Sequence, residues 1–277
     1  MDFIIDCHTH ISDLQDLEEY TDKNKDDVFA LTMRYPDFSQ EHRVEFNQNI
    51  DALIADNRRI AVIEGIDINM DMTKQLAEIE ANIEKRRIVG LKIYLGYQPI
   101  FADDAKLKPV YQFAKKHNLT IVYHCGVVAS TEKVGTFYKH SSYLYPIDDI
   151  AVTYPEVKFV ISHLGFPKLW DTAAIVMKND NVFTDISGLF EDDSDFYALT
   201  NQVIHDLCSV QNYWGNLYAK VMYGTDYCGD DTPLKEIRAY LKIAKQAFDY
   251  DVLDDIFYNN AVKAYPRLEQ YLKRADE

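Results

Sequence analysis

The sequence predicts an α/β fold, a (β/α)₈ barrel, for this chain of 277 residues. Short apolar runs rich in β-branched and aromatic residues recur along the chain, and segments with helical periodicity separate them. Strands that alternate with helices and are apolar on both faces are typical of a parallel sheet covered on both sides. The length also fits, because such a barrel needs about 250 residues. No Pro/Gly/Ser-rich linker interrupts the series, so residues 1–277 are interpreted as a single domain.

Each repeat begins with a predicted strand. The strands are expected near residues 3–10, 28–34, 60–68, 88–96, 119–126, 157–163, 181–187 and 220–226. Helices are expected over residues 40–58, 71–87, 106–117, 143–154, 168–179, a stretch within 194–218, and 233–248. Regularly spaced apolar residues support the helices, such as Leu76, Ile79 and Ile83 in the second. After the last strand come extra C-terminal helices, at 251–258 and 260–274.

Composition and charge narrow the function classes. The apolar fraction of 47% and the charged fraction of 27% are ordinary for a globular protein. With 29 basic against 45 acidic residues, the net charge of −16 disfavours binding to nucleic acid or to anionic lipid. No secretory signal and no membrane-length apolar run is found, so a cytoplasmic location without membrane contact is expected. The expected partner is a small-molecule substrate, and assembly into a homo-oligomer stays open.

The first strand ends in two histidines one residue apart, His8 and His10. Successive strand side chains point to opposite faces, so these two share a face and can converge on one metal ion. An H-x-H alone is a weak signal. Three later strands, however, each end on a further metal-competent residue: His124, His163 and Asp226. Barrel enzymes place their catalytic residues at these C-terminal strand ends.

Other histidines fall elsewhere. His42, His117 and His205 lie on predicted helices and are interpreted as structural or solvent-exposed. Four cysteines lack C-x-x-C spacing, so neither a zinc knuckle nor a disulfide framework is indicated. The candidate site therefore depends on the strand-end residues.

Six segments spread over nearly the whole chain carry a family resemblance: Asp6–His10, Gly90–Tyr94, Tyr123–Gly126, Tyr154–Gly165, Tyr223–Tyr227 and Asn259–Ala261. With these segments the chain resembles the amidohydrolase superfamily of TIM barrels, in the branch that includes aminocarboxymuconate semialdehyde decarboxylase and related metal-dependent hydrolases.

The resemblance implies a divalent metal, most often zinc, with manganese as an alternative. Its implied ligands are His8, His10, His124 and Asp226, with His163 as a catalytic acid/base or as a ligand in two-metal relatives. Imidazoles and a carboxylate suit these cations, and too few ligands to fill the shell leave room for water. That water is the expected nucleophile, with Asp226 as ligand and proton carrier and His163 polarising the carbonyl.

Lys92 lies in the fourth strand, where a lysine is costly unless it is paired. Gly90, Lys92 and Tyr94 are expected to face the barrel interior, and Leu91 and Ile93 to pack outward. Some superfamily members carry a carboxylated lysine here that bridges two metals. The favoured interpretation is an unmodified catalytic amine, paired with a carboxylate or directed at the substrate, beside a single metal.

Substrate clues are few. An aromatic-lined pocket is expected from residues at or after strand ends, namely Tyr94, Tyr97, Phe101, Tyr138, Tyr143 and Tyr227. Residues 127–142 are interpreted as a long fifth loop that could cover the site. Arg34 is a candidate for holding a substrate carboxylate, with a surface position as the alternative.

Three candidate functions are consistent with the sequence. The leading one is a metal-dependent hydrolase that attacks an amide, ester or lactone with metal-bound water. The second is a non-oxidative decarboxylase of an aromatic or unsaturated carboxylic acid. The third, from another class, is a catalytically silent metal-binding protein, which is disfavoured because polar ligands persist on four strands at a cost in stability.

Overall fold

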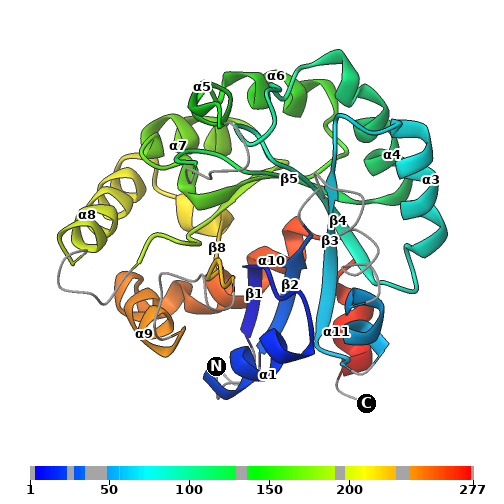
Figure 1. The fold of residues 1–277 in the computed structure, drawn as a ribbon. Coiled ribbons are helices and arrows are strands. Elements are labelled where there is room, and N and C mark those ends of the chain that lie inside the picture. The colour runs from blue at the N-terminus through cyan, green and yellow to red at the C-terminus, as the bar shows by residue number, and fades with distance from the viewer. Residues whose placement is uncertain are drawn as a thin grey trace.

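The computed structural model describes residues 4–23, 28–34, 49–55, 57–128, 136–190, 197–228 and 237–275. Their strands form one eight-stranded parallel sheet in the sequential order β1 to β8, which confirms the predicted (β/α)₈ TIM barrel. The strands are β1 (Ile4–Thr9), β2 (Val28–Met33), β3 (Ile60–Ile66), β4 (Ile88–Ile93), β5 (Thr120–Tyr123), β6 (Phe159–Ile161), β7 (Val182–Asp185) and β8 (Val221–Met222). Figure 1 shows the helices arranged around them.

The strands end earlier than predicted, most of all β8, and β6 also ends early. The regular ladder stops at Ile161 and Met222, short of the predicted ends at 163 and 226. The backbone leaves extended geometry there, since φ is +58° at His163 and +64° at Asp226. Most of the candidate site residues therefore lie just beyond their strands, at the start of the βα loops.

The first and last strands meet at the seam of the barrel. The amide of Cys7 donates to the carbonyl of Tyr223 at 3.0 Å, and the amide of Asp226 donates to the carbonyl of His8 at 2.8 Å. The buried Asp6 carboxylate adds side-chain bonds, because it accepts from the amide of Thr225 at 3.0 Å and from its hydroxyl at 2.7 Å. These bonds join β1 to the segment after β8 beside the candidate site.

Helices cover the outside of the barrel. They are α1 (Leu14–Lys23), α3 (Met72–Asn82), α4 (Lys108–His117), α5 (Tyr138–Ser142), α6 (Tyr145–Thr153), α7 (Leu169–Lys178), α8 (Tyr197–Trp214), α9 (Ile237–Ala247), α10 (Asn260–Ala264) and α11 (Glu269–Ala275). Shorter helical turns are η1 (Ala105–Leu107), η2 (Ser162–Gly165), η3 (Leu217–Lys220), η5 (Tyr250–Val252) and the π-helical η6 (Asp255–Asn259). Among the described helices, none combines the length and the apolar character needed to cross a membrane.

Local sequence explains several helix ends. Asp71 caps α3 by accepting from the amides of Thr73 and Lys74. Helix α4 has a proline in its first turn and ends at Asn118, which adopts the left-handed conformation that asparagine tolerates. Of the predicted helix 40–58, residues 49–55 are helical, while 40–48 and 56 lie outside the described residues, as does His42.

Two helices differ from the sequence-based prediction. Helix α1 was not predicted, because its polar sequence has few apolar residues; Asp13 and Asp16 cap its start through bonds to the amides of Asp16 and Ser12, both 2.9 Å long. The segment 127–142 was predicted to be a loop, but its end forms α5. Residues 129–135 of that segment lie outside the described part of the chain.

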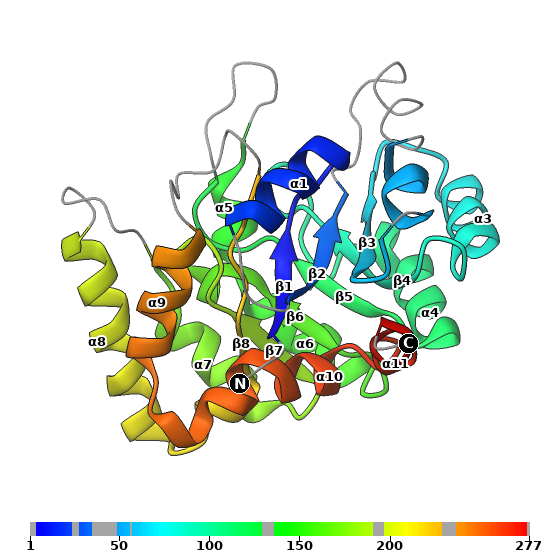
Figure 2. The ribbon, with the colours of Figure 1, turned by 90° about the horizontal axis from the view of Figure 1, so that it is seen from below.

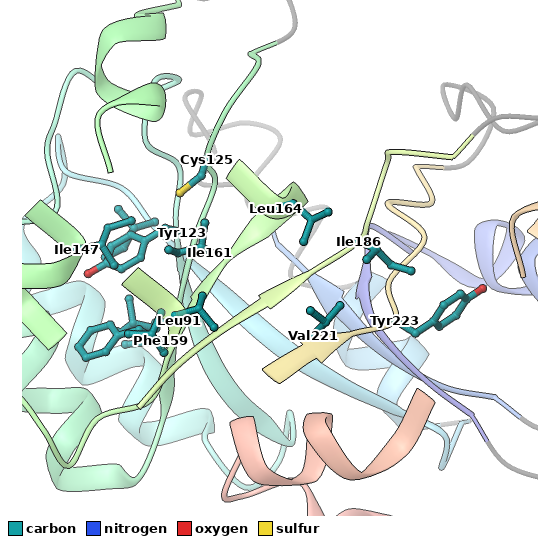
Figure 3. Packing of buried hydrophobic residues seen from close by; sticks show 14 of the residues in the cluster. Leu91, Tyr123, Cys125, Ile147, Phe159, Ile161, Leu164, Ile186, Val221 and Tyr223 are labelled. Carbon is teal, nitrogen blue, oxygen red and sulfur yellow. The ribbon is translucent and has the colours of Figure 1, made fainter. Parts of the chain in front are cut away.

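Two apolar layers hold the barrel together. The outer layer lies between strands and helices and includes Leu91 and Ile93, which pack outward as predicted. Figure 3 shows part of this layer, in which the rings of Tyr123 and Phe159 stack with centroids 6.1 Å apart. The inner layer fills the barrel with alternate strand residues such as Phe29 and Val160.

The C-terminal helices close the bottom of the barrel, where the strands begin. Tyr265, Leu268 and Leu272 from this region belong to the inner apolar layer. The buried amide of Asn260 donates to the carbonyls of Tyr218 (2.7 Å) and Val221 (2.8 Å), which anchors α10 below β8. Figure 2 shows α10 and α11 on this side and α1 at the opposite end, where the strands finish.

Candidate metal centre

A bulge in β1 aims both histidines of the first strand at the site. Asp6 pairs with Ala30 and Thr9 pairs with Thr32, so β1 has one residue more than β2 over this stretch. Such a bulge re-aims the side chains that follow it. Cys7 belongs to the inner apolar layer, while the rings of His8 and His10 lie above it with centroids 5.4 Å apart.

Asp226 meets these two histidines from the other side of the seam. Its Oδ1 lies 3.3 Å from Nε2 of His8 and 3.2 Å from Nε2 of His10. Burial alone would raise the pKa of Asp226, but His163, His10 and His8 hold it well below its usual range. The positive φ of this non-glycine residue fits a functional position, where the surrounding fold maintains an unfavourable conformation.

The hydrogen bonds of the two rings indicate which nitrogens face Asp226. Nδ1 of His10 lies 3.2 Å from the carbonyl oxygen of Met33, and Nδ1 of His8 lies 3.2 Å from Oδ2 of Asp185. Because both neighbours are acceptors, Nδ1 carries the proton in each neutral ring and Nε2 keeps its lone pair. Burial, followed by the Lys92 ammonium, lowers the pKa of His8 to about 3, so this ring is neutral at pH 7.

When both rings are neutral, three electron-pair donors converge: the Nε2 atoms of His8 and His10 and Oδ1 of Asp226. This arrangement is unfavourable unless a cation lies among them, and two imidazoles with a carboxylate suit zinc or manganese. The residues present thus fit a divalent metal.

His163 lies next to this group. Its backbone is also left-handed, and its ring centroid lies 4.7 Å from that of His8. Nδ1 of His163 lies 3.0 Å from the carbonyl oxygen of Ser187 and 2.8 Å from its hydroxyl. By the same reasoning Nδ1 carries the proton, so Nε2 of the neutral ring is a proton acceptor.

His124 is oriented differently from the other three. Its Nε2 lies 3.0 Å from the carbonyl oxygen of Val127, which leaves Nδ1 as the nitrogen with a lone pair. Its ring contacts His163 at 5.0 Å and Tyr97 at 4.8 Å between centroids. Within the described residues, the groups that could hold a metal are His8–His10–Asp226 and His8–His163–Asp185, and neither contains His124.

Asp185 and Ser187 belong to this centre, and the sequence interpretation missed both. Asp185 is the last residue of β7 and is fully buried. Its carboxylate contacts His8, the hydroxyl of Ser187 and the amide of His163. The available signal was an aspartate inside an apolar run, since a buried carboxylate without partners is costly.

Lys92 is fully buried, and its Nζ donates to the hydroxyl of Ser162 at 2.8 Å. Its partner is thus a hydroxyl, while the carboxylates of Asp185 and Asp226 act on it through space. Burial is the larger effect and lowers the pKa of Lys92 to about 8. A buried cation therefore lies close to the histidine cluster.

Arg34 does not lie on the surface of the protein. It is buried, and its Nη1 contacts both carboxylate oxygens of Glu64 at 2.8 Å. Arg86 lies 3.7 Å from the same carboxylate, so these residues form a buried ionic group in the barrel wall. The alternative of a surface position is wrong, and the role of Arg34 in holding a substrate carboxylate stays a prediction.

Replacing Arg34 with Met is expected to destabilise the protein by about 3 kcal/mol, because Glu64 would stay buried with only the more distant Arg86 near it. Urea unfolding measures this change. The double variant Arg34→Met/Glu64→Leu should regain most of the stability. If Arg34→Met kept full stability and lost only substrate affinity, Arg34 would instead have a role in binding.

Some of the predicted aromatic residues lie at the end of the barrel where the strands finish. Tyr94 is buried and its hydroxyl donates to the carbonyl of Arg34 at 3.1 Å, so it supports the wall. Tyr97 lies beside His124, while Phe101 and Tyr143 contact each other at 5.8 Å between centroids. Tyr227 is buried against Tyr20.

The remaining helical histidines, His117 and His205, lie on α4 and α8, away from the site.

A family model described as amidohydrolase matches residues 5–267. The chain belongs to the amidohydrolase family. A search of the curated proteins found no match.

Solved structures share the fold of this amidohydrolase at low sequence identity. An uncharacterised TIM-barrel protein from Bordetella bronchiseptica is 14% identical with a TM-score of 0.70, over 99% of this chain and 100% of that one. A 5-carboxyvanillate decarboxylase from Sphingomonas paucimobilis is 14% identical, with a TM-score of 0.68 over 96% and 99% of the two chains. A putative 2-pyrone-4,6-dicarboxylic acid hydrolase from Pseudomonas putida is 12% identical, with a TM-score of 0.67 over 96% and 98%.

Proposed function

We propose that this amidohydrolase is a metal-dependent hydrolase that adds water to the carbonyl of an amide, ester or lactone in a small molecule. The observation that carries the proposal is the convergence of the two Nε2 atoms of His8 and His10 on Oδ1 of Asp226. A divalent cation bound there, zinc or manganese, would supply Lewis-acid activation of water and of the substrate carbonyl. We propose no direct metal contact for His124 in the conformation described here, because its Nε2 faces Val127.

Asp226 has the position of a proton carrier. Its side chain is 31% exposed, whereas that of His8 is 1% exposed, so the carboxylate is the member of this pair that a substrate can reach. Asp226 accepts the proton that water loses when oxygen attacks the carbonyl carbon. It then donates that proton to the nitrogen or oxygen that departs as the bond to carbon breaks.

His163 and Lys92 assist this step in two different ways. The neutral His163 ring presents Nε2 as a proton acceptor, and the protonated ring stabilises negative charge on the carbonyl oxygen. The Lys92 ammonium adds a positive potential below the site, which favours a substrate that develops or carries negative charge.

The His163→Asn variant is expected to lower kcat/KM by about 10²- to 10⁴-fold, the usual contribution of an acid/base group, while it retains the metal. Asparagine is the suitable replacement because it tolerates the left-handed backbone at this position. Steady-state kinetics and elemental analysis of the same samples measure the two quantities. Equal loss of metal and activity would make His163 a ligand of a second ion.

A decarboxylase is the second candidate. The observation that favours it is the buried Lys92 cation, which suits an anionic substrate, and one structural neighbour is a decarboxylase. In that case the metal site would anchor the substrate, while His163 or Asp226 would deliver a proton to the carbon that loses CO₂.

Isotope labelling separates the two reactions. The zinc- and manganese-loaded protein is incubated with panels of lactones, amides, esters and aromatic carboxylic acids in H₂¹⁸O. For the hydrolase, one ¹⁸O atom should enter the product carboxylate and no CO₂ should be released. Release of CO₂ without consumption of water would replace the hydrolase proposal with the decarboxylase.

A further inference from the structure

Asp185 connects the two histidines that differ most in proposed role. Its Oδ2 lies 3.2 Å from Nδ1 of His8, and its Oδ1 accepts from the backbone amide of His163 at 2.9 Å. Oδ1 also accepts from the hydroxyl of Ser187 at 2.5 Å and from its amide at 3.1 Å. The carboxylate is fully buried, so these donors replace the water that it has lost.

The contact with His8 decides where that ring carries its proton. An ionised carboxylate can only accept, and the Ser187 hydroxyl, 3.0 Å from the same Nδ1, already donates its single proton to Asp185. Nδ1 of His8 therefore has two acceptors beside it and must be the protonated nitrogen. Nε2, which faces Asp226, is left with its lone pair.

The contact with His163 holds a backbone that is otherwise unfavourable. His163 and Leu164 both have positive φ, at +58° and +51°, which costs free energy at non-glycine residues. Oδ1 of Asp185 bonds the amide of His163 where the chain enters this turn. One carboxylate thus sets the proton of His8 and supports the turn that presents His163.

We propose that Asp185 is the positioning residue of the metal centre, and that it keeps His8 in the Nδ1–H form required for its Nε2 to bind a cation. This inference rests on the proposed function and deepens it. A carboxylate that accepts from a ligating histidine typically changes metal affinity by about 10- to 100-fold. Ser187 assists by bringing a second acceptor to the same nitrogen.

The Asp185→Asn variant reverses this hydrogen bond while keeping the shape of the side chain. The two backbone amides of His163 and Ser187 hold the asparagine carbonyl in place of Oδ1, so its NH₂ group faces His8. His8 must then accept at Nδ1 and carry its proton on Nε2. That proton occupies the position of the cation.

Asp6→Asn is the matched control. Asp6 is also fully buried and also accepts from two backbone amides, those of His8 and Thr225, and from hydroxyl groups. Its carboxylate accepts from the main-chain amide of His8, whereas the carboxylate of Asp185 contacts the imidazole, so Asp6 has similar burial and backbone donors without the proposed role.

The experiment measures zinc affinity by competition with a chromophoric chelator in the full-length protein. Asp185→Asn should bind zinc about 10- to 100-fold more weakly than the wild type, and Asp6→Asn within about threefold of it. Equal affinity of Asp185→Asn and the wild type would overturn the proposal. Two zinc ions per wild-type chain, one of them lost in Asp185→Asn, would make Asp185 a ligand and would also overturn it.

A second measurement does not require a variant of Asp185 to fold. Histidine-selective ¹⁵N labelling of the zinc-free wild type reports which ring nitrogen carries the proton, and the His8→Gln spectrum assigns the resonance. Nδ1–H at His8 supports the proposal, and Nε2–H overturns it. A protein that shows Nδ1–H and weaker zinc binding in Asp185→Asn, yet hydrolyses no substrate, would contradict only the proposed function.

Discussion

The Asp226→Asn variant is expected to lose activity by about 10³-fold, the middle of the range for a residue that transfers protons in the reaction. Asparagine keeps the volume of the side chain and tolerates the backbone φ of +64°. It removes the negative charge that faces the Nε2 atoms of His8 and His10, so zinc affinity should fall in parallel. Kinetics and elemental analysis of one preparation measure both changes.

The control for this variant is Asp180→Asn, since Asp180 is fully exposed. It should retain wild-type activity and metal content. Full zinc occupancy together with wild-type activity in Asp226→Asn would rule out Asp226 as ligand and as proton carrier.

The Lys92→Met variant is expected to be more stable and less active than the wild type. Burial lowers the pKa of Lys92 from 10.5 to about 8, so the folded state holds this charge at a cost. The shift corresponds to roughly 3 kcal/mol, and loss of the hydrogen bond to Ser162 offsets about 1 kcal/mol of the gain. A net gain of about 2 kcal/mol at pH 7 should accompany a fall in kcat/KM that exceeds any fall in metal occupancy.

The pH dependence of unfolding tests the cause of this gain. The cost of the charged lysine is fully present below pH 8 and disappears as the pH rises from 8 to 10.5, because the folded lysine is then neutral and the unfolded lysine gives up its proton ever more easily. The stability difference between Lys92→Met and the wild type should shrink across that interval. Lys115→Met, at an exposed lysine, should change stability by less than about 1 kcal/mol. A destabilised Lys92→Met at pH 7 would contradict the prediction.

The alternation of apolar runs and helical segments was sufficient to predict the barrel. Each of the eight strands lies within the range that the sequence predicts, because each run is buried on both faces. Helix α1 could not be found in this way, since its start depends on side-chain caps at Asp13 and Asp16. The short last strand was overestimated because its continuation, residues 223–225, is buried like the strand but the chain turns away at Asp226.

The sequence predicted that His8, His10 and Asp226 lie together, because each lies at the end of a strand. The structure places them in one group. Their surroundings were harder to predict. Asp185 supports His8 through a contact between β7 and β1, which are far apart in the sequence, and His124 turns its Nε2 to the carbonyl of Val127 in the loop after β5. The ion pair of Arg34 was not predicted because its partner, Glu64, comes from another strand, and such a pairing has no local signal in the sequence.

The seam between β1 and β8 has a consequence for biosynthesis. Asp6 and Thr225 are 219 positions apart, so the ribosome makes the first half of the metal centre long before the second. The nascent chain cannot assemble a high-affinity site, and its inner apolar layer stays open until Tyr265 and Leu268 have emerged. Contacts of such large sequence separation slow folding. Metal capture therefore follows the synthesis of Asp226, and the newly made chain relies on its early strands staying unaggregated until α10 and α11 have emerged.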